Sequence, residues 1–373
     1  MFYKLTCVIA ASAVIFLSAC DGKEAKPALA TSLANTPMMI AAESGDANAQ
    51  YELGVKYSEA QGITQNFAEA IRWYKLAAAQ GHPTAQTRLG YMYDRGQGVD
   101  QDHVEAVRWY KLAATQGQRS AQYNLGLSYQ IGEGVGQDNA EAVKWYKLAA
   151  SKGDPEAQSK LGDAYYFGEI VTRDFTEAVK WFGLAAAQGK ASAQFYLGNM
   201  HLAGEGVTQN YAEAMKWFKL AGDQGNKSAQ YNLGIMNEDP RYGMQDRLNA
   251  VQWYKLAAAQ GHANAQYKLA FSYQKGQGVI QDYAEAAKLY KLAAAQGNVT
   301  AQHNLGTLYE DGNGVDKDYV RAHMWFNLAA AKGDKASEER RSYVGAYQMT
   351  PEKIEKAQKM ARECQARDFK SCD

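Results

Sequence analysis

The sequence predicts an all-α fold in which eight helix–turn–helix units of equal length stack as an α-solenoid, with capping helices at both ends. Both halves of each unit space their small and apolar residues three or four apart, as amphipathic helices do. A glycine also recurs every 36 residues without any insertion, at Gly45, Gly81, Gly117, Gly153, Gly189, Gly225, Gly261, Gly297 and Gly333. One such unit cannot bury its apolar face alone, so neighbouring units must supply the core.

Residues 1–19 are expected to be a signal peptide that is removed. Lys4 precedes an apolar run over residues 5–17, which is too short to span a bilayer. The run ends in Leu-Ser-Ala-Cys20, which resembles the lipobox of bacterial lipoproteins. That resemblance implies cleavage before Cys20, lipidation of Cys20 and a flexible linker over residues 20–36. A plain signal peptide is the alternative.

The resemblance to lipoproteins also implies a location. The protein is expected in the bacterial cell envelope, facing the periplasm, with the lipid on Cys20 as its only membrane contact. Asp21 resembles an inner-membrane retention signal and favours that leaflet. The outer membrane and the cell surface are the alternatives.

Residues 37–45 are expected to form an N-terminal cap. Thr36 before Pro37 is a favourable helix start, since proline fits the first helical turn. Residues 38–42 align with the second half of a repeat's second helix, so they cover the first of the eight copies over residues 46–333.

The third copy, residues 118–153, shows how one unit is built. Ala121, Leu125 and Tyr129 recur every four residues and define a first helix, helix A. Gly126 would cost about 1 kcal/mol against alanine in a helix, so its recurrence in other copies implies a close helix–helix approach. Gly132 and Gly134 end helix A, because glycine adopts the left-handed conformation easily.

Helix B of seven copies carries a tryptophan among alanines, as Trp145 does beside Ala142 and Ala149. This pattern predicts interlocking of large and small side chains in the core. All seven tryptophans of the chain occupy this position, with Leu289 in the remaining copy.

Residues 334–373 are expected to form the C-terminal cap and tail. Residues 334–347 read as a degenerate ninth helix A, and Thr350-Pro351-Glu352 begins a last helix that runs to about Arg367. Cys364 and Cys372 are the only cysteines left if Cys20 carries a lipid. A disulfide between them would close a nine-residue loop, with free thiols as the alternative.

The repeated residues resemble those of the Sel1-like repeat, a relative of the tetratricopeptide repeat. The shared pattern is Ala-Gln-x-x-Leu-Gly-x-x-Tyr, then Gly-x-Gly-Val, then Glu-Ala-x-x-Trp-Tyr-x-x-Ala-Ala-x-x-Gly. The resemblance implies a right-handed superhelix with the A helices on its concave side. It also implies adaptor or scaffold roles, often in envelope proteins that bind a partner or host protein.

Helix periodicity indicates which residues would face a partner. If Ala121, Leu125 and Tyr129 face the core, then Tyr123, Leu127 and Gln130 lie on the opposite side. The aromatic and aliphatic residues at the first two of these positions form the candidate groove for a protein or peptide: Tyr91, Tyr123, Leu127, Phe195, Tyr231, Ile235, Tyr267 and Phe271. The alternative is that the recurrent tyrosines pack between neighbouring A helices.

The sixth copy replaces the glycine turn with Asn-Glu-Asp-Pro-Arg-Tyr-Gly over residues 237–243. Proline in that place predicts an altered loop between helices A and B. The loop is either a contact site or drift in a surface turn.

No catalytic or cofactor site is expected. The six histidines show no metal-binding spacing, and His82 and His262 read as solvated residues of the inter-repeat turn. Equal numbers of basic and acidic residues, 40 each, argue against nucleic-acid binding. Ser272 and Lys275 match the Ser-x-x-Lys of penicillin-recognising enzymes, but the companion motifs are absent.

The function expected from these observations is that of a non-enzymatic protein-interaction scaffold of the bacterial cell envelope. A surface-exposed host-protein binder is an alternative within the same class. A cell-wall or β-lactam-directed hydrolase is the alternative from another class.

Overall fold

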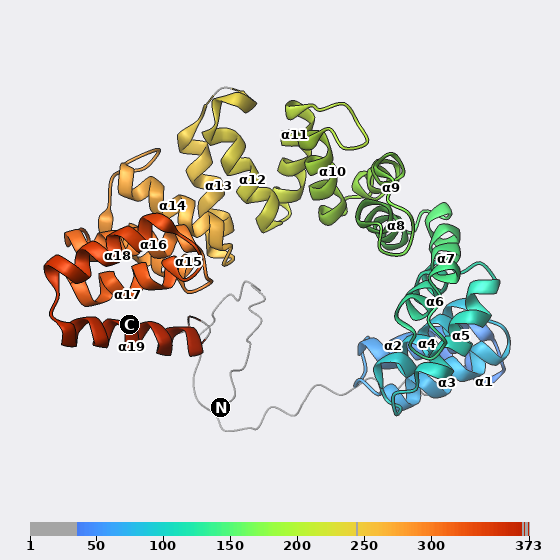
Figure 1. Ribbon diagram of the computed structural model, residues 1–373. Helices are drawn as coiled ribbons and strands as arrows, with labels where there is room; N and C mark the ends of the chain where they lie inside the picture. Colours follow the sequence, from blue (N-terminus) through green and yellow to red (C-terminus); the bar gives the residue numbers. More distant parts are fainter. Residues whose placement is uncertain (1–35, 244, 368, 370–371, 373) are drawn as a thin grey trace, which may run out of the picture.

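The computed structural model describes residues 36–243, 245–367, 369 and 372, which form an arc of paired helices (Figure 1). These residues contain 19 α-helices and one short 3-10 helix, and no strand. The all-α solenoid predicted from the repeat is therefore confirmed. None of the described helices has the length and apolar character needed to cross a bilayer.

From α2 to α12 the A helices lie on the inner side of the arc (Figure 1). They are α2 (Ala47–Glu59), α4 (Pro83–Arg95), α6 (Arg119–Ile131), α8 (Pro155–Phe167), α10 (Ala191–Ala203), α12 (Lys227–Glu238), α14 (Ala263–Lys275) and α16 (Val299–Asp311). This arrangement agrees with the concave placement that the resemblance implied.

The B helices form the outer layer over the same part of the arc (Figure 1). They are α3 (Phe67–Ala79), α5 (His103–Thr115), α7 (Asn139–Ser151), α9 (Phe175–Ala187), α11 (Tyr211–Asp223), α13 (Arg247–Ala259), α15 (Tyr283–Ala294) and α17 (Tyr319–Ala330). Each outer helix packs against the inner helix of its own copy and against that of the next copy.

Polar caps fix where the helices begin and end. Asp138 begins α7, because its carboxylate accepts hydrogen bonds from the backbone N–H groups of Ala140 and Glu141, at 2.9 and 3.0 Å. Gly132 ends α6 in the left-handed conformation, with φ of 83°. Each turn of the solenoid is thus set by short local signals.

The core of seven of the eight copies is built on a ring from helix B that lies against a glycine of helix A, and the seventh copy has Ala270 in place of the glycine. A Cβ atom added to Gly126 would meet the Tyr146 ring at 2.8 Å, so the close approach predicted for the recurrent glycine is confirmed. Tyr146 is fully buried, whereas the preceding Trp145 is only half-buried. The aromatic residue that follows the tryptophan is therefore the deeper core residue, which the sequence analysis did not single out.

Helices at both ends cover the core. The helix α1 (Pro37–Glu43) starts at Thr36 and packs on α2. At the other end, α18 (Lys335–Gln348) and α19 (Pro351–Ala366) both pack on α17. The outer-face Leu328 is consequently buried, while Leu292, one copy earlier, is 52 % exposed.

A disulfide bond joins Cys364 to Cys372 in the structure, with a Cα–Cα distance of 4.8 Å. Both cysteines belong to the core cluster of the last copies, together with Trp325 and Leu328. The bond therefore fixes the residues after α19 to the capped end. Cys20 and residues 1–35 lie outside the described residues.

Candidate partner-binding groove

Cavities lie between neighbouring inner helices. One cavity, of about 340 Å³, is bordered by Thr87 and Tyr91 of α4 and by Ser120 and Asn124 of α6. Tyr91 has 41 % of its surface exposed there. An aromatic side chain open to solvent between two polar walls offers a partner one apolar contact with hydrogen-bonding groups on either side.

A second cavity, of about 500 Å³, adjoins the same two helices. Tyr91 and Leu127 form part of its lining, with Ile131 at the end of α6 and His103 at the start of α5. Two of the predicted groove residues, Tyr91 and Leu127, thus line adjoining cavities on the concave side.

A third cavity, of about 340 Å³, lies between α8 and α10 and combines a carboxylate with aromatic rings. Asp163, Phe167 and Tyr196 line it. The Phe167 and Tyr196 rings stand edge to face, with centroids 5.7 Å apart, and Phe167 is 49 % exposed. Burial raises the pKa of Asp163 to about 6, although Lys160 opposes the shift.

The predicted aromatics of the first groove position pack against their own copy. Tyr123 lies 5.8 Å from Tyr146, measured between ring centroids, and is half-buried. Burial raises the pKa of the Tyr123 hydroxyl, which agrees with this packing. The same ring contact with helix B is made by Phe195, Tyr231 and Tyr267. These four residues hold helix A against helix B and do not line the cavities between the inner helices.

The remaining predicted residues lie in the later copies. Ile235 lines a cavity of about 300 Å³ together with Glu238 and Lys268. Phe271 is half-buried, with its ring 6.5 Å from that of Tyr267 and the Lys275 ammonium 5.9 Å from its centroid.

Three groove positions beside the predicted Leu127 were missed in the sequence. At about 100° per residue, Ser120, Asn124 and Ile131 share one stripe of α6 with Leu127. Tyr123 falls about 70° to one side of that stripe. The row that contains Asn124 supplies Arg88, Lys160, Tyr196 and Lys268 to the cavities in other copies. The direction opposite the core indicated Tyr123 instead, because the cavities open toward the next copy and not straight away from the core.

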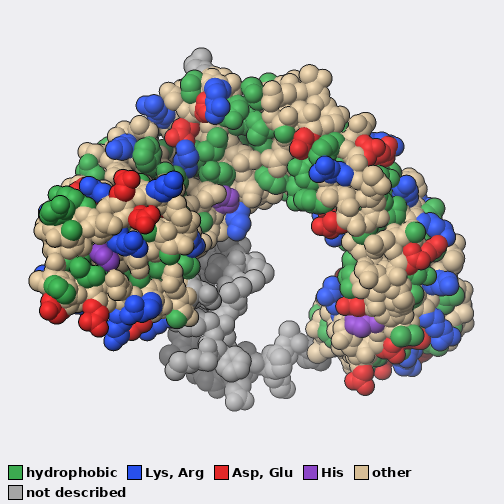
Figure 2. Space-filling view, viewed as in Figure 1, with side chains coloured by type: hydrophobic (Ala, Val, Ile, Leu, Met, Phe, Trp, Pro, Cys, Tyr) green, Lys and Arg blue, Asp and Glu red, His purple; other side chains and the backbone are tan. Residues whose placement is uncertain are grey.

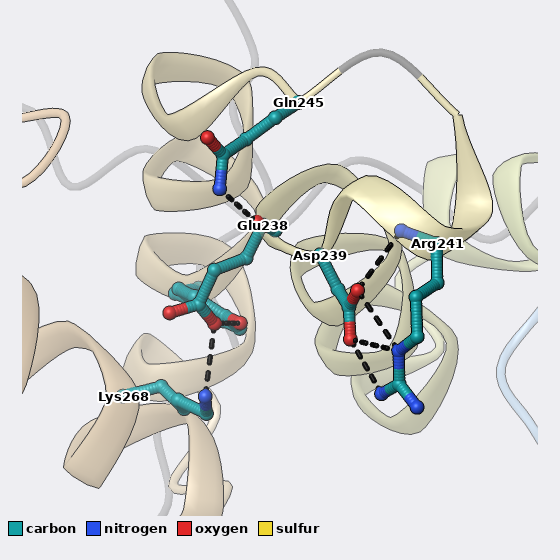
Figure 3. A network of polar contacts seen from close by, with 6 residues as sticks. Glu238, Asp239, Arg241, Gln245 and Lys268 are labelled. Atoms are coloured by element: carbon teal, nitrogen blue, oxygen red, sulfur yellow. Dashed lines mark hydrogen bonds and ion pairs between the residues drawn. The ribbon is translucent and has the colours of Figure 1, made fainter.

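The altered turn of the sixth copy is held by polar contacts (Figure 3). Glu238, the last residue of α12, accepts hydrogen bonds from Lys268 Nζ at 2.9 Å and from the Tyr254 hydroxyl at 2.6 Å. Gln245 donates to the backbone carbonyl of Glu238 at 2.6 Å. Figure 3 shows Lys268 reaching Glu238 from the neighbouring helix α14.

The turn itself is the 3-10 helix η1 (Pro240–Tyr242). Asp239 caps η1 and forms an ion pair with Arg241. The Tyr242 ring packs edge to face on Tyr211 of the preceding copy, with centroids 5.0 Å apart. Proline thus replaces the glycine turn without interrupting the solenoid, because the loop forms its own contacts.

His82 and His262 are not free loop residues, contrary to expectation. His82 Nδ1 accepts a hydrogen bond from the backbone N–H of Ala85 and thereby caps α4. The His82 ring stacks on the Tyr51 ring, with centroids 4.8 Å apart. Burial lowers the pKa of His82. His262 repeats both contacts with Ala265 and Tyr231. Their role is to cap helices at the junction between copies.

The Ser-x-x-Lys match does not form a nucleophilic site in the structure. Ser272 is 5 % exposed, and its hydroxyl donates to the backbone carbonyl of Lys268, one turn earlier in α14. A hydroxyl used in this way is neither accessible to a substrate nor paired with a base.

Comparison with known proteins places the repeat in a family. The Sel1 repeat model matches eight consecutive segments, 47–82, 83–118, 119–154, 155–190, 191–226, 227–262, 263–298 and 299–334. The chain belongs to the Sel1 repeat family. The segments begin one residue after the predicted copies. Among curated proteins, none matches this chain.

Solved structures of Sel1 repeat proteins resemble this one. A Sel1 repeat protein from Oxalobacter formigenes is 34 % identical, with a TM-score of 0.62, over 82 % of this chain and 89 % of that chain. A protective antigen of uropathogenic Escherichia coli with the same fold is 29 % identical, with a TM-score of 0.46, over 89 % of this chain and 95 % of that chain.

Proposed function

We propose that this Sel1 repeat protein is a non-enzymatic scaffold that binds an extended segment of a partner protein along its concave side. The observation that carries the proposal is the succession of cavities between inner helices, each with an exposed apolar side chain beside polar groups. Tyr91, Ile131 and Phe167 are 41 %, 52 % and 49 % exposed and lie in three successive copies.

The variation between copies supports this proposal. The core positions repeat, as Leu89, Leu125 and Leu161 do, and all three are fully buried. The groove positions change: the residues that correspond to Asn124 include Arg88, Lys160, Tyr196 and Lys268. A scaffold that reads one particular segment needs different side chains along its length, whereas the fold needs the same ones.

The charge of the surface favours a protein segment over a polyanion. Basic and acidic side chains are interspersed on the face seen in Figure 2. Lys160 and Asp163 lie in one cavity, and Glu238 and Lys268 in another. A groove of mixed sign suits a partner with alternating charges, while nucleic acid requires a continuous basic surface.

A matched set of variants tests the groove. We expect that replacing Tyr91, Leu127, Phe167 and Tyr196 by alanine lowers the amount of partner protein recovered in a pull-down at least tenfold. The helicity measured by circular dichroism should stay unchanged. Alanine at the exposed outer-face residues Leu112 and Leu184 is the control and should leave recovery unchanged. Equal loss from both sets would contradict a concave binding site.

We further propose that the scaffold is anchored in the cell envelope through a lipid on Cys20. The apolar run and the Leu-Ser-Ala-Cys20 sequence support this. Metabolic labelling with an alkyne fatty acid should label the parent chain and not the Cys20→Ser variant. Protease added to intact cells then separates a surface-exposed host-protein binder, which is cleaved, from a periplasm-facing scaffold, which is protected.

A further inference from the structure

Three side chains able to bind a metal ion meet where the second and third copies join. Asp94 lies near the end of α4, His103 is the first residue of α5, and Glu133 lies in the turn after α6. One ligand atom from each lies within 4.8 Å of the other two. All three border the cavity of about 500 Å³ described above.

The geometry of the three residues suits one small cation. His103 Nδ1 lies 2.9 Å from Asp94 Oδ1 and 4.0 Å from Glu133 Oε2. Ligands of a zinc-type ion lie about 2.0–2.2 Å from the metal, and hence about 3–4 Å from one another. The side chain of Glu133 is half-exposed and lies in a turn. A small shift therefore brings its carboxylate within coordination distance of an ion bound by Asp94 and His103.

The Tyr110 hydroxyl provides an independent indication of a ligand. Tyr110 is 98 % buried, and its side chain lines the same cavity. In other copies the equivalent hydroxyl bonds to the residue 16 positions earlier: Tyr74 to Ser58, Tyr146 to Gln130, Tyr254 to Glu238 and Tyr290 to Gln274. Tyr110 forms no such bond with Asp94, and no hydrogen bond joins its hydroxyl to another described group. A water on a bound metal would supply that partner.

The cluster occurs once in the repeat array. The equivalent triads of other copies lack the histidine, and they read Ser58/Phe67/Gln97, Gln130/Asn139/Glu169, Tyr166/Phe175/Glu205, Leu202/Tyr211/Arg241, Glu238/Arg247/Gln277 and Gln274/Tyr283/Asn313. Three separate replacements therefore coincide at this one junction, and the other junctions serve as built-in controls.

The negative charge of the two carboxylates is only partly compensated by basic side chains, which favours binding of a cation. Asp94 and Glu133 are both acidic, and among the described residues that line the cavity Arg95 is the one lysine or arginine, with its Nε 3.8 Å from the second carboxylate oxygen of Asp94. Gln101, which also lines the cavity, is neutral. Arg95 binds the outer edge of Asp94, while Oδ1 faces His103.

We propose that Asp94, His103 and Glu133 bind a divalent transition-metal ion such as Zn²⁺ and that this ion clamps the second copy to the third. Imidazole and carboxylates are ligands that such ions accept, and water completes the coordination. Because the three ligands lie far apart in the sequence, no short sequence motif indicates this metal site.

Isothermal titration of Zn²⁺ into the full chain tests the proposal, with Cys7→Ser and Cys20→Ser to remove free thiols. The expected result is one ion per chain, and at least a tenfold loss of affinity in His103→Asn and Asp94→Gln. These replacements copy the residues of the next junction, Asn139 and Gln130, which the fold accommodates. Glu169→Gln and His82→Asn are controls and should leave the affinity unchanged.

Visible absorption of bound Co²⁺ and thermal unfolding give second readouts. The midpoint of unfolding should rise with Zn²⁺ concentration in the parent and in the controls, and not in His103→Asn. Retained affinity in His103→Asn and Asp94→Gln would overturn the assignment, as would the absence of binding at millimolar Zn²⁺.

Discussion

The side-chain amide of Gln116 donates a 2.8 Å hydrogen bond to Oε1 of Gln86, which lies in the inner helix α4 of the same copy. Gln86 is 96 % buried, and its own amide donates to the backbone carbonyl of Ala78 at 3.1 Å. One glutamine therefore joins two successive outer helices. The same bond between glutamines occurs in the pairs Gln80–Gln50, Gln188–Gln158, Gln224–Gln194, Gln260–Gln230 and Gln296–Gln266.

Two junctions lack this bond because a lysine replaces the donor. Lys152 and Lys332 occupy the position of Gln116, and their ammonium groups donate to the backbone carbonyls of Gly117 and Gly297. The Oε1 atoms of Gln122 and Gln302 are consequently buried without a hydrogen-bond partner. A buried acceptor left unpaired costs about 1–3 kcal/mol.

Lys152→Gln should therefore stabilise the protein by about 1 kcal/mol, since it supplies the missing donor to Gln122 Oε1. Urea unfolding followed by circular dichroism measures the change. The reverse substitution, Gln116→Lys, should destabilise the contact between α3 and α5 by a similar amount. A neutral result in both variants would show that the glutamine bonds do not contribute to stability.

Gly126→Ala should destabilise the third copy by about 1–3 kcal/mol, because the new methyl group would overlap the buried Tyr146 ring. Gly183 in α9 is the matched control, since a Cβ there has no neighbour within 4 Å. Gly183→Ala should stabilise the protein by about 0.5–1 kcal/mol through helix propensity. Thermal unfolding of the two variants should thus shift in opposite directions.

Much of the fold follows from the repeated residues because they act locally. The turn glycines, the helix caps and the small-residue stripe of helix A all specify structure within a few positions, and each is seen where the pattern predicted it. The burial of Tyr146 below Trp145 could not be read in the same way. It depends on how the outer helix rotates against Gly126, which is a property of the packed pair.

The stability of the fourth copy should depend on pH through Asp163. Its pKa in the folded protein is raised to about 6, above the ordinary value of 3.8, so the neutral acid is favoured by folding. The contribution of Asp163 to the free energy of unfolding is therefore largest below about pH 4, and it is lost as the pH rises through 6.

Asp163→Asn should remove this dependence. The variant should be more stable than the parent by about 1–3 kcal/mol at pH 7, with the difference disappearing near pH 4. Asn199 fills the equivalent position in the next copy, so the amide fits that site. A difference that stays constant between pH 4 and pH 7 would contradict the burial of a protonated Asp163.

Removal of the disulfide should loosen the C-terminal cap alone. Replacing Cys364 and Cys372 by serine reopens a nine-residue loop, at a cost of ~2.5 kcal/mol by the loop-entropy estimate. In a repeat array each copy contacts only its neighbours, so the effect should stay local. Hydrogen exchange should speed up in α19 and around Leu328 and remain unchanged in α2 to α7. A uniform increase along the chain would argue for one cooperative unit.

The groove was harder to predict than the fold, since its residues do not repeat. Tyr91 and Leu127 line cavities between inner helices, whereas Tyr123 and its equivalents pack on helix B. Phe167 and Tyr196 went unnoticed because their contribution depends on the facing helix of the next copy. The triad of Asp94, His103 and Glu133 is similarly visible only once two copies are stacked.

Site-specific photocrosslinking in living cells tests the concave binding face most directly. A benzophenone amino acid at Tyr91 or Phe167, both open to the groove, should yield the same discrete adduct of higher mass. Placed at Leu112 or Leu184, which are similarly exposed on the outer helices, it should yield none. Adducts formed equally from both faces, or from the outer face alone, would contradict a scaffold that binds its partner on the concave side.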